Sequence, residues 1–247
     1  YICRVYAPGK GDSALNELYF LLSIVVSFLL LLAAYRFFGK TGLYVWICVA
    51  MILSNIEAAK LIKLFGVSVT LGNVVYGSTF LATDILCEMY GQKEANKTVF
   101  LGFFVTVVFV IMTQLTLLFR PADGDFADAS LKTIFAITPR LTVASIVTYL
   151  IMQRVDIWLY SFIREKTGGK HLWLRNNLAT ITTQLFDSAM FTLLAFVGIH
   201  SFKTVVVLIF STYAVKVMIA AADTPFLYIA RKIRPLTNDL PDAASKK

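Results

Sequence analysis

Residues 18–35 read LYFLLSIVVSFLLLLAAY and contain no charged side chain. The hydrocarbon core of a bilayer is about 30 Å thick, and a helix needs roughly 20 mostly apolar residues to cross it. The run therefore predicts a membrane-spanning helix. We do not expect a signal peptide here, because the run is longer than the apolar part of such peptides and no small-residue cleavage site precedes Arg36.

Six further apolar segments follow this run, at residues 42–56, 65–83, 98–119, 141–163, 176–198 and 204–230. Hydrophobic residues make up 58% of the 247 positions, charged residues only 15%, and the mean hydropathy of +0.73 is far above that of soluble domains. The sequence predicts an all-α, polytopic bundle of seven transmembrane helices. It divides into an N-terminal extension with an extra helix (1–40), a six-helix core (41–235) and a cytoplasmic tail (236–247).

The positive charges are unevenly distributed between the predicted loops. Lys and Arg number 23 against 15 Asp and Glu, a balance that can indicate nucleic-acid binding. Here, however, the basic residues fall at the ends of apolar segments, and under seven spans four groups share one side: 36–40, 93–97, 164–175 and 231–234. Cytoplasmic loops carry such an excess of Lys and Arg. We therefore expect the N-terminus outside, the C-terminus in the cytoplasm, and no nucleic-acid partner.

Polar residues recur inside the apolar segments, where each ionisable group costs several kcal/mol unless it faces a protein interior or water. At a rise of about 1.5 Å per residue, five helices bring such groups to a band near mid-membrane. One shared polar cavity explains this convergence. Its predicted members are Asn55, Asp84, Gln153, Asp156, Gln184, Asp187 and Lys216, with Glu88, Arg140 and Asn177 in secondary or gating positions.

Helical spacing places several of these residues on common faces, because positions three and four apart lie above one another. The two stripes are Asn177, Thr180, Gln184 and Asp187, and Tyr213, Lys216, Ala220 and Asp223. Both are expected to face inward. An alternative is that Asp187 and Lys216 form a structural ion pair with no ligand, although buried pairs seldom stabilise a protein once desolvation is counted.

Residues for catalysis are missing from the sequence. It has no GxxxxGK[ST] phosphate loop, no HExxH and no GxSxG motif, and His171 and His200 stand alone. The three cysteines show no CxxC pairing. We therefore expect no enzymatic activity, no catalytic residue, no cofactor and no metal site.

Four motifs carry a family resemblance: FLATDILCEMYG at residues 80–91, QRVDIW at 153–158, QLFDS at 184–188 and YAVK at 213–216. With them, the chain resembles the queuosine precursor transporter family over about residues 46–231. The resemblance implies uptake of 7-deazaguanine bases bearing a cyano or aminomethyl group, or of queuine, across the bacterial inner membrane. It also implies a six-helix core like that of the substrate-binding subunits of energy-coupling-factor transporters.

A guanine-like edge offers N–H donors beside a carbonyl acceptor, which a carboxylate and an amide read well together. Asp187 and Gln184 are expected in that role, with Lys216 neutralising Asp187 when no base is bound. Asp84 or Asp156 would receive a cationic aminomethyl group. Flat bases favour aromatic walls, for which Trp158 and Tyr213 are the candidates.

Three functional hypotheses remain open on the sequence alone. The chain is a transporter that works by itself through alternating access, a binding subunit that docks on an ATP-driven module, or a membrane enzyme or scaffold. Docking would use the small-residue ridge Ala50, Ser54 and Ala58. A homodimer in the lipid bilayer is a further expectation.

Overall fold

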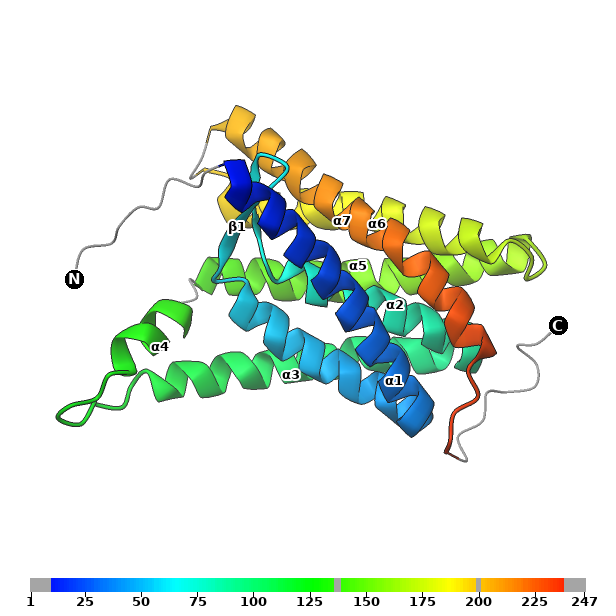
Figure 1. Cartoon of the computed structure of the whole chain (residues 1–247), viewed down its shortest axis with the longest axis horizontal. Helices are drawn as coiled ribbons and strands as arrows, with labels where there is room; N and C mark the ends of the chain where they lie inside the picture. The colour runs from blue at the N-terminus through cyan, green and yellow to red at the C-terminus, as the bar shows by residue number, and fades with distance from the viewer. Residues whose placement is uncertain (1–9, 136–138, 199–200, 238–247) are drawn as a thin grey trace.

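A computed structural model describes residues 10–135, 139–198 and 201–237, with the side chains of 10–13, 68 and 139–142 outside the description. Within these residues the chain forms seven helices and one β-hairpin (Figure 1). The elements are α1 (Lys10–Glu57), β1 (Leu61–Leu64), β2 (Val67–Thr70), α2 (Asn73–Tyr90), α3 (Gln92–Thr116), α4 (Asp128–Phe135), α5 (Pro139–Lys166), α6 (Leu172–Phe196) and α7 (Phe202–Lys232).

Helix α1 turns back on itself at Gly39. This residue has φ 58° and ψ −136°, a conformation that a residue without Cβ adopts readily. Figure 1 shows the chain reversing its direction between the two halves of α1. A Cβ on Gly42 would lie 2.1 Å from the carbonyl oxygen of Ala34, so the second half begins in close contact with the end of the first.

The helix predicted over residues 65–83 is wrong in its first part. Residues 61–70 form an antiparallel hairpin in which Leu61 pairs with Thr70 and Leu64 with Val67. Phe65 and Gly66, at its turn, both have positive φ, which ends any helix there. The β-branched residues that follow favour a strand. Helix α2 begins only at Asn73 and continues past the predicted end to Tyr90.

Helix α2 is the central element of the bundle. All its residues from Ser78 to Met89 are buried, and it packs against α1, α3, α5 and α7. The outer surface is apolar instead, with Leu29, Phe104 and Phe210 all more than half exposed. Among the described residues five helices, α1, α3, α5, α6 and α7, are long and apolar enough to cross a membrane. The protein is therefore a polytopic membrane bundle with its polar residues inside.

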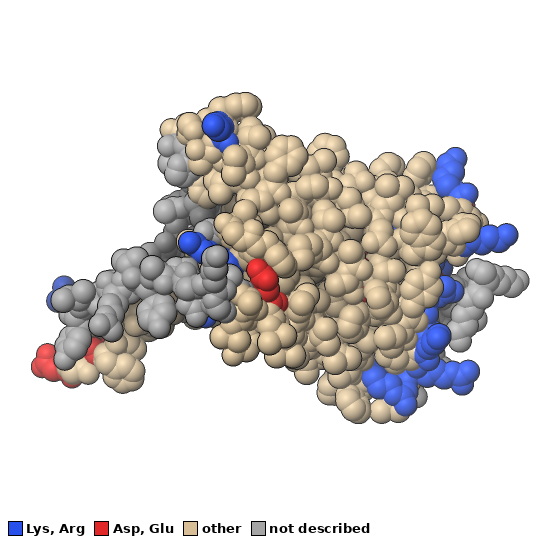
Figure 2. Space-filling view, turned by 45° about the horizontal axis from the view of Figure 1, so that its top comes forward, with Lys and Arg blue, Asp and Glu red and all other residues tan. Residues whose placement is uncertain are grey.

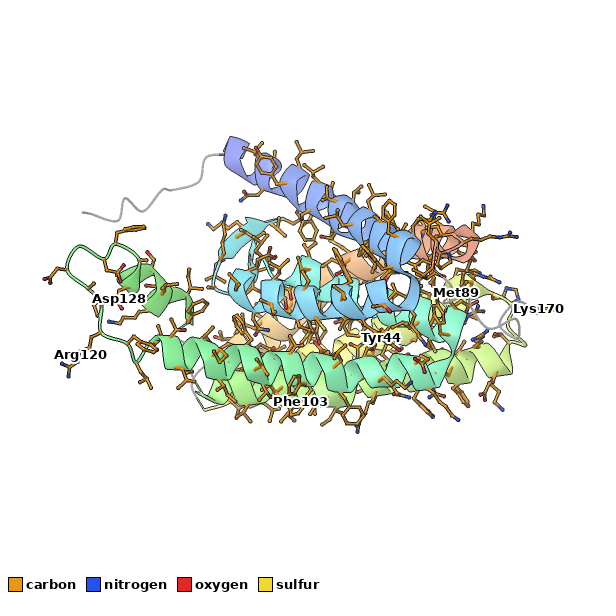
Figure 3. The ribbon with its side chains drawn as sticks, turned by 90° about the horizontal axis from the view of Figure 1, so that it is seen from below. Tyr44, Met89, Phe103, Arg120, Asp128 and Lys170 are labelled. Atoms are coloured by element: carbon orange, nitrogen blue, oxygen red, sulfur yellow. The ribbon has the colours of Figure 1, made fainter. Side chains whose placement is uncertain are left out.

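Basic side chains gather at one end of the bundle, as Figure 2 shows. This end holds the turn of α1 and the end of α7, which are joined where the Arg36 guanidinium donates to the carbonyl oxygen of Arg234. Lys40 pairs with Glu94 of α3 at 3.4 Å. Arg120 and Asp128 lie at the opposite end from Lys170 (Figure 3). The asymmetry expected from the sequence is present in three dimensions.

Candidate functional site

A small cavity lies between α2, α6 and α7. Its free volume is about 10 Å³, room for about one water molecule. Three aligned faces form it: the first turns of α2, and residues three or four apart on α6 and α7. The lining residues are Asn73, Tyr76, Gly77, Thr180, Gln184, Lys216, Ile219, Ala220 and Asp223.

A buried ion pair stands at this cavity. The Lys216 ammonium donates to Oδ2 of Asp187, and the two side chains are 9% and 3% exposed. The Tyr76 hydroxyl donates to the other carboxylate oxygen at 3.3 Å, and the Lys216 nitrogen lies 5.3 Å from the centre of the Tyr76 ring. The pairing anticipated for Asp187 and Lys216 is confirmed. It compensates two charges that neither lipid nor an apolar core would accept singly.

Several polar atoms around the cavity have no partner among the described residues. Oε1 of Gln184 and the hydroxyl of Thr180 are buried without a hydrogen bond. Asp223 is better satisfied, because the Asn176 amide donates to its Oδ1 at 2.6 Å. Buried acceptors without a donor are uncommon in folded proteins, and they mark places where a ligand or water can bind. The cavity therefore offers acceptors that a molecule with N–H groups can satisfy.

A second polar group lies beside this cavity, between α2, α5 and α6. The Gln153 amide donates to the Thr83 hydroxyl at 2.8 Å, and the Thr183 hydroxyl donates to Oδ1 of Asp156 at 2.7 Å. Asp84 is fully buried, and neither of its oxygens has a hydrogen-bond partner in the described part of the chain. None of these five side chains lines the cavity.

Glu88 forms a third cluster toward the basic end. One nitrogen of the Arg175 guanidinium lies 2.7 Å from both Glu88 oxygens, and Tyr160 donates to Oε2 at 3.1 Å. Arg164 and Arg231 approach the same carboxylate at 3.8 and 3.5 Å. Glu88 thus ties α5, α6 and α7 to α2 at this end.

The remaining predicted site residues are not brought to the cavity. Asn55 is half-buried, and its amide donates to the Met51 carbonyl of its own helix. Trp158 is 56% exposed and stacks on Phe162, so the structure places it on the outer surface, where a base in the cavity does not reach it.

Three more predicted residues are the gating candidates Asn177 and Arg140 and the aromatic candidate Tyr213. The Asn177 amide donates to Thr224 and to the Trp173 carbonyl, and Asn177 is half-buried beside the cavity. Tyr213 is half-buried one turn before Lys216, outside the lining. The side chain of Arg140 lies outside the described residues.

Several residues of these clusters were not predicted as site residues. Arg175 was counted among loop charges, yet it lies in the first turn of α6 with 1% of its side chain exposed. No sequence signal distinguishes Asn176 and Tyr76, because many other polar residues also lie near helix ends. Asp223 carried a usable signal, because it continues the Lys216 stripe.

Comparison with known proteins bears on this arrangement. Residues 70–230, which include all residues of the three clusters except Arg231, match a family model described as "Putative vitamin uptake transporter". The chain belongs to this family. This description and the name of the relative reported next show that the chain is a transporter and not an enzyme. This match and the relative described next confirm the resemblance drawn from the four motifs.

One curated relative of the chain comes from Bacillus subtilis (strain 168) and is named "Probable queuosine precursor transporter". It is 38% identical over 221 residues, which cover 89% of this chain and 96% of the relative. No solved structure matches the chain.

Proposed function

We propose that this protein imports 7-deazaguanine precursors of queuosine, the cyano or aminomethyl base, across the bacterial inner membrane. The observation that carries the proposal is the Asp187–Lys216 pair beside the unpartnered Gln184 oxygen, at one cavity between three helices. The name of the Bacillus subtilis relative supports the choice of substrate. Most of the chain aligns with that relative.

Seven passes are proposed, two by α1 and one each by α2, α3, α5, α6 and α7. The reversal of α1 at Gly39 supports two passes for this helix. α2 is short, with 18 residues, and carries the carboxyl groups of Asp84 and Glu88, but its enclosure by four helices shields it from lipid. The basic end of the bundle is assigned to the cytoplasm by the positive-inside rule, which puts the N-terminus outside.

The cavity chemistry suits a guanine-like edge. Gln184 Oε1 accepts an N–H of the base, and Asp187 accepts a second when Lys216 swings aside. Tyr76 at the wall supplies an aromatic face. A cationic aminomethyl group would meet Asp223 first, because Asp223 lines the cavity whereas Asp84 and Asp156 do not.

A base is far larger than the free volume of about 10 Å³, so admission requires the helices around the cavity to separate. Transporters commonly move one group of helices against another around a midplane site. The Glu88 cluster holds the cytoplasmic ends of α2, α5, α6 and α7 together, and we assign it the role of inner gate. Release into the cytoplasm would require this cluster to open.

Uptake of labelled base into liposomes that contain only this protein tests the proposal. Transport by the protein alone is expected. An empty-liposome control and competition by unlabelled guanine would set the background and the selectivity. No uptake, together with stoichiometric co-purification of an ATPase, would show instead a binding subunit of the energy-coupling-factor type.

A further inference from the structure

Asp84 is a buried carboxyl group that base recognition at the cavity does not use. It is fully buried in the central helix α2, and neither oxygen accepts a hydrogen bond from a described residue. No Lys or Arg of the described residues lies within ion-pair distance of it. Arg175 and Lys216 are already paired, with Glu88 and Asp187.

The charged groups that act electrostatically on Asp84 are mostly of its own sign. They are Asp156 on α5, Asp223 on α7, Glu88 on α2 itself and Arg175 on α6. Two carboxyl groups that share a dry site do not both ionise, because each disfavours the charge of the other. A proton bound to Asp84 removes both this repulsion and the desolvation of an unpaired charge, which costs several kcal/mol.

Amide and hydroxyl groups surround the two carboxyls. Gln153 bonds to Thr83, the neighbour of Asp84, and keeps its own buried Oε1 without a partner. Asp156 accepts from Thr183 with one oxygen and leaves the other, Oδ2, without a partner. A metal cation needs several oxygen ligands at once. In residues 10–135, 139–198 and 201–237, no three His, Cys, Asp or Glu side chains come together to hold a metal ion. A proton, in contrast, needs only one carboxylate oxygen.

The carboxyl pair is connected to the cavity through α6 and α7. Thr183, the donor to Asp156, directly precedes Gln184 of the cavity lining. Asp223 lines the cavity, and its charge acts electrostatically on Asp84. A base that draws on Gln184 or Asp223 therefore changes the surroundings of the two carboxyls, and the reverse also holds.

We propose that Asp84, buried in α2 without a hydrogen-bond partner among the described residues, is the binding site of a coupling proton, and that one proton crosses the membrane on Asp84 with each imported base. The proton binds from outside, stays on Asp84 while the site is closed, and leaves when the cytoplasmic end opens and water reaches the carboxyl. This inference rests on the proposed transport of a base.

The test uses the full chain in liposomes with a trapped pH-sensitive dye. Valinomycin and equal potassium on both sides hold the voltage at zero, the outside is one pH unit more acidic, and the probe is labelled 7-cyano-7-deazaguanine, a neutral base. Wild type is expected to accumulate the base up to about tenfold, because one pH unit equals a tenfold concentration ratio. The dye should report acidification when base is added.

Asp84→Asn cannot release a proton. We expect it to exchange labelled for unlabelled base, while its accumulation ratio stays near one whatever the pH gradient. Asp84→Glu retains a titratable carboxyl and should retain accumulation, as should the control Asp128→Asn, whose ion pair with Lys132 lies on the exposed α4.

Four outcomes would overturn the assignment while the proposed transport stands. In the first, the wild-type protein equilibrates the base whatever the pH gradient, and in the second its accumulation of base follows a sodium gradient. In the third, the dye reports no proton movement with the wild-type protein. In the fourth, Asp84→Asn accumulates base as the wild-type protein does. Should Asp84→Asn fail to fold, the dye measurement on wild type and the behaviour of Asp84→Glu still decide. A wild type that moves no base at all overturns the proposed function itself and this inference with it.

Discussion

Replacing Asp187 by Asn tests the chemistry of the cavity most directly. The change keeps the size of the side chain and removes the negative charge. In the folded protein Asp187 accepts from Lys216 and, at 3.3 Å, from the Tyr76 hydroxyl. The variant thus loses the charged acceptor proposed to read the base, and it leaves the Lys216 ammonium buried without its counter-ion.

Two effects of different size follow. A hydrogen bond to a charged group contributes roughly 1.5–3 kcal/mol, so base affinity should fall about tenfold to a hundredfold. Breaking one side of a buried ion pair costs about 3–5 kcal/mol of stability, which should appear as a lower Tm in detergent.

A binding assay on purified protein separates the two effects when Asp187→Asn/Lys216→Met is included. The double variant removes both charges, so most of the lost Tm should return while base affinity stays low. Asp128→Asn, on an exposed helix, serves as the matched control with unchanged Kd and Tm. Wild-type affinity in both Asp187 variants would refute the reasoning and leave the pair a purely structural contact.

Three further changes give distinct results. Glu88→Gln should lower the free energy of unfolding by about 3–5 kcal/mol, because it leaves Arg175 buried without its carboxylate; an unchanged Tm would contradict this. Trp158→Ala should leave base affinity within about twofold of wild type, because the ring lies on the outer surface; a loss above about tenfold would place it at the base. Gly102→Ala puts a Cβ 2.2 Å from the Tyr149 hydroxyl, and such overpacking costs about 1–3 kcal/mol, measurable as a fall in Tm that Tyr149→Phe should partly reverse.

Most of the helical bundle could be predicted from local composition. The apolar runs from residue 98 onward fall on α3, α5, α6 and α7, although two of them extend two or three residues past the end of their helix. The first two runs lie on either side of the break in α1. The hairpin at residues 61–70 could not be predicted in this way, because a short apolar run satisfies a strand as well as a helix. Its positive φ at Phe65 and Gly66 settled the choice.

The candidate site was predictable in part. Gln184 and Lys216 line one cavity, with Asp187 paired to Lys216. Whether they bind a base stays a prediction. Trp158 was misplaced, because aromatic residues are abundant throughout this chain and their presence in a motif does not tell which side of the helix faces lipid. Arg175 was counted as a loop charge because the start of α6 could not be located to within a turn.

The sequence alone determined that this protein lies in a membrane, that its basic residues divide the loops into two kinds, and that polar groups occur at bilayer depth. These properties depend on the length and composition of apolar runs, which can be read from consecutive residues of the chain. Tertiary structure alone decided which polar groups meet: Asp187 with Lys216, Glu88 with Arg175, and Asp84 with no partner among the described residues. Partnership depends on how each helix is rotated and how deep it sits against the others, and no stretch of the chain encodes that by itself.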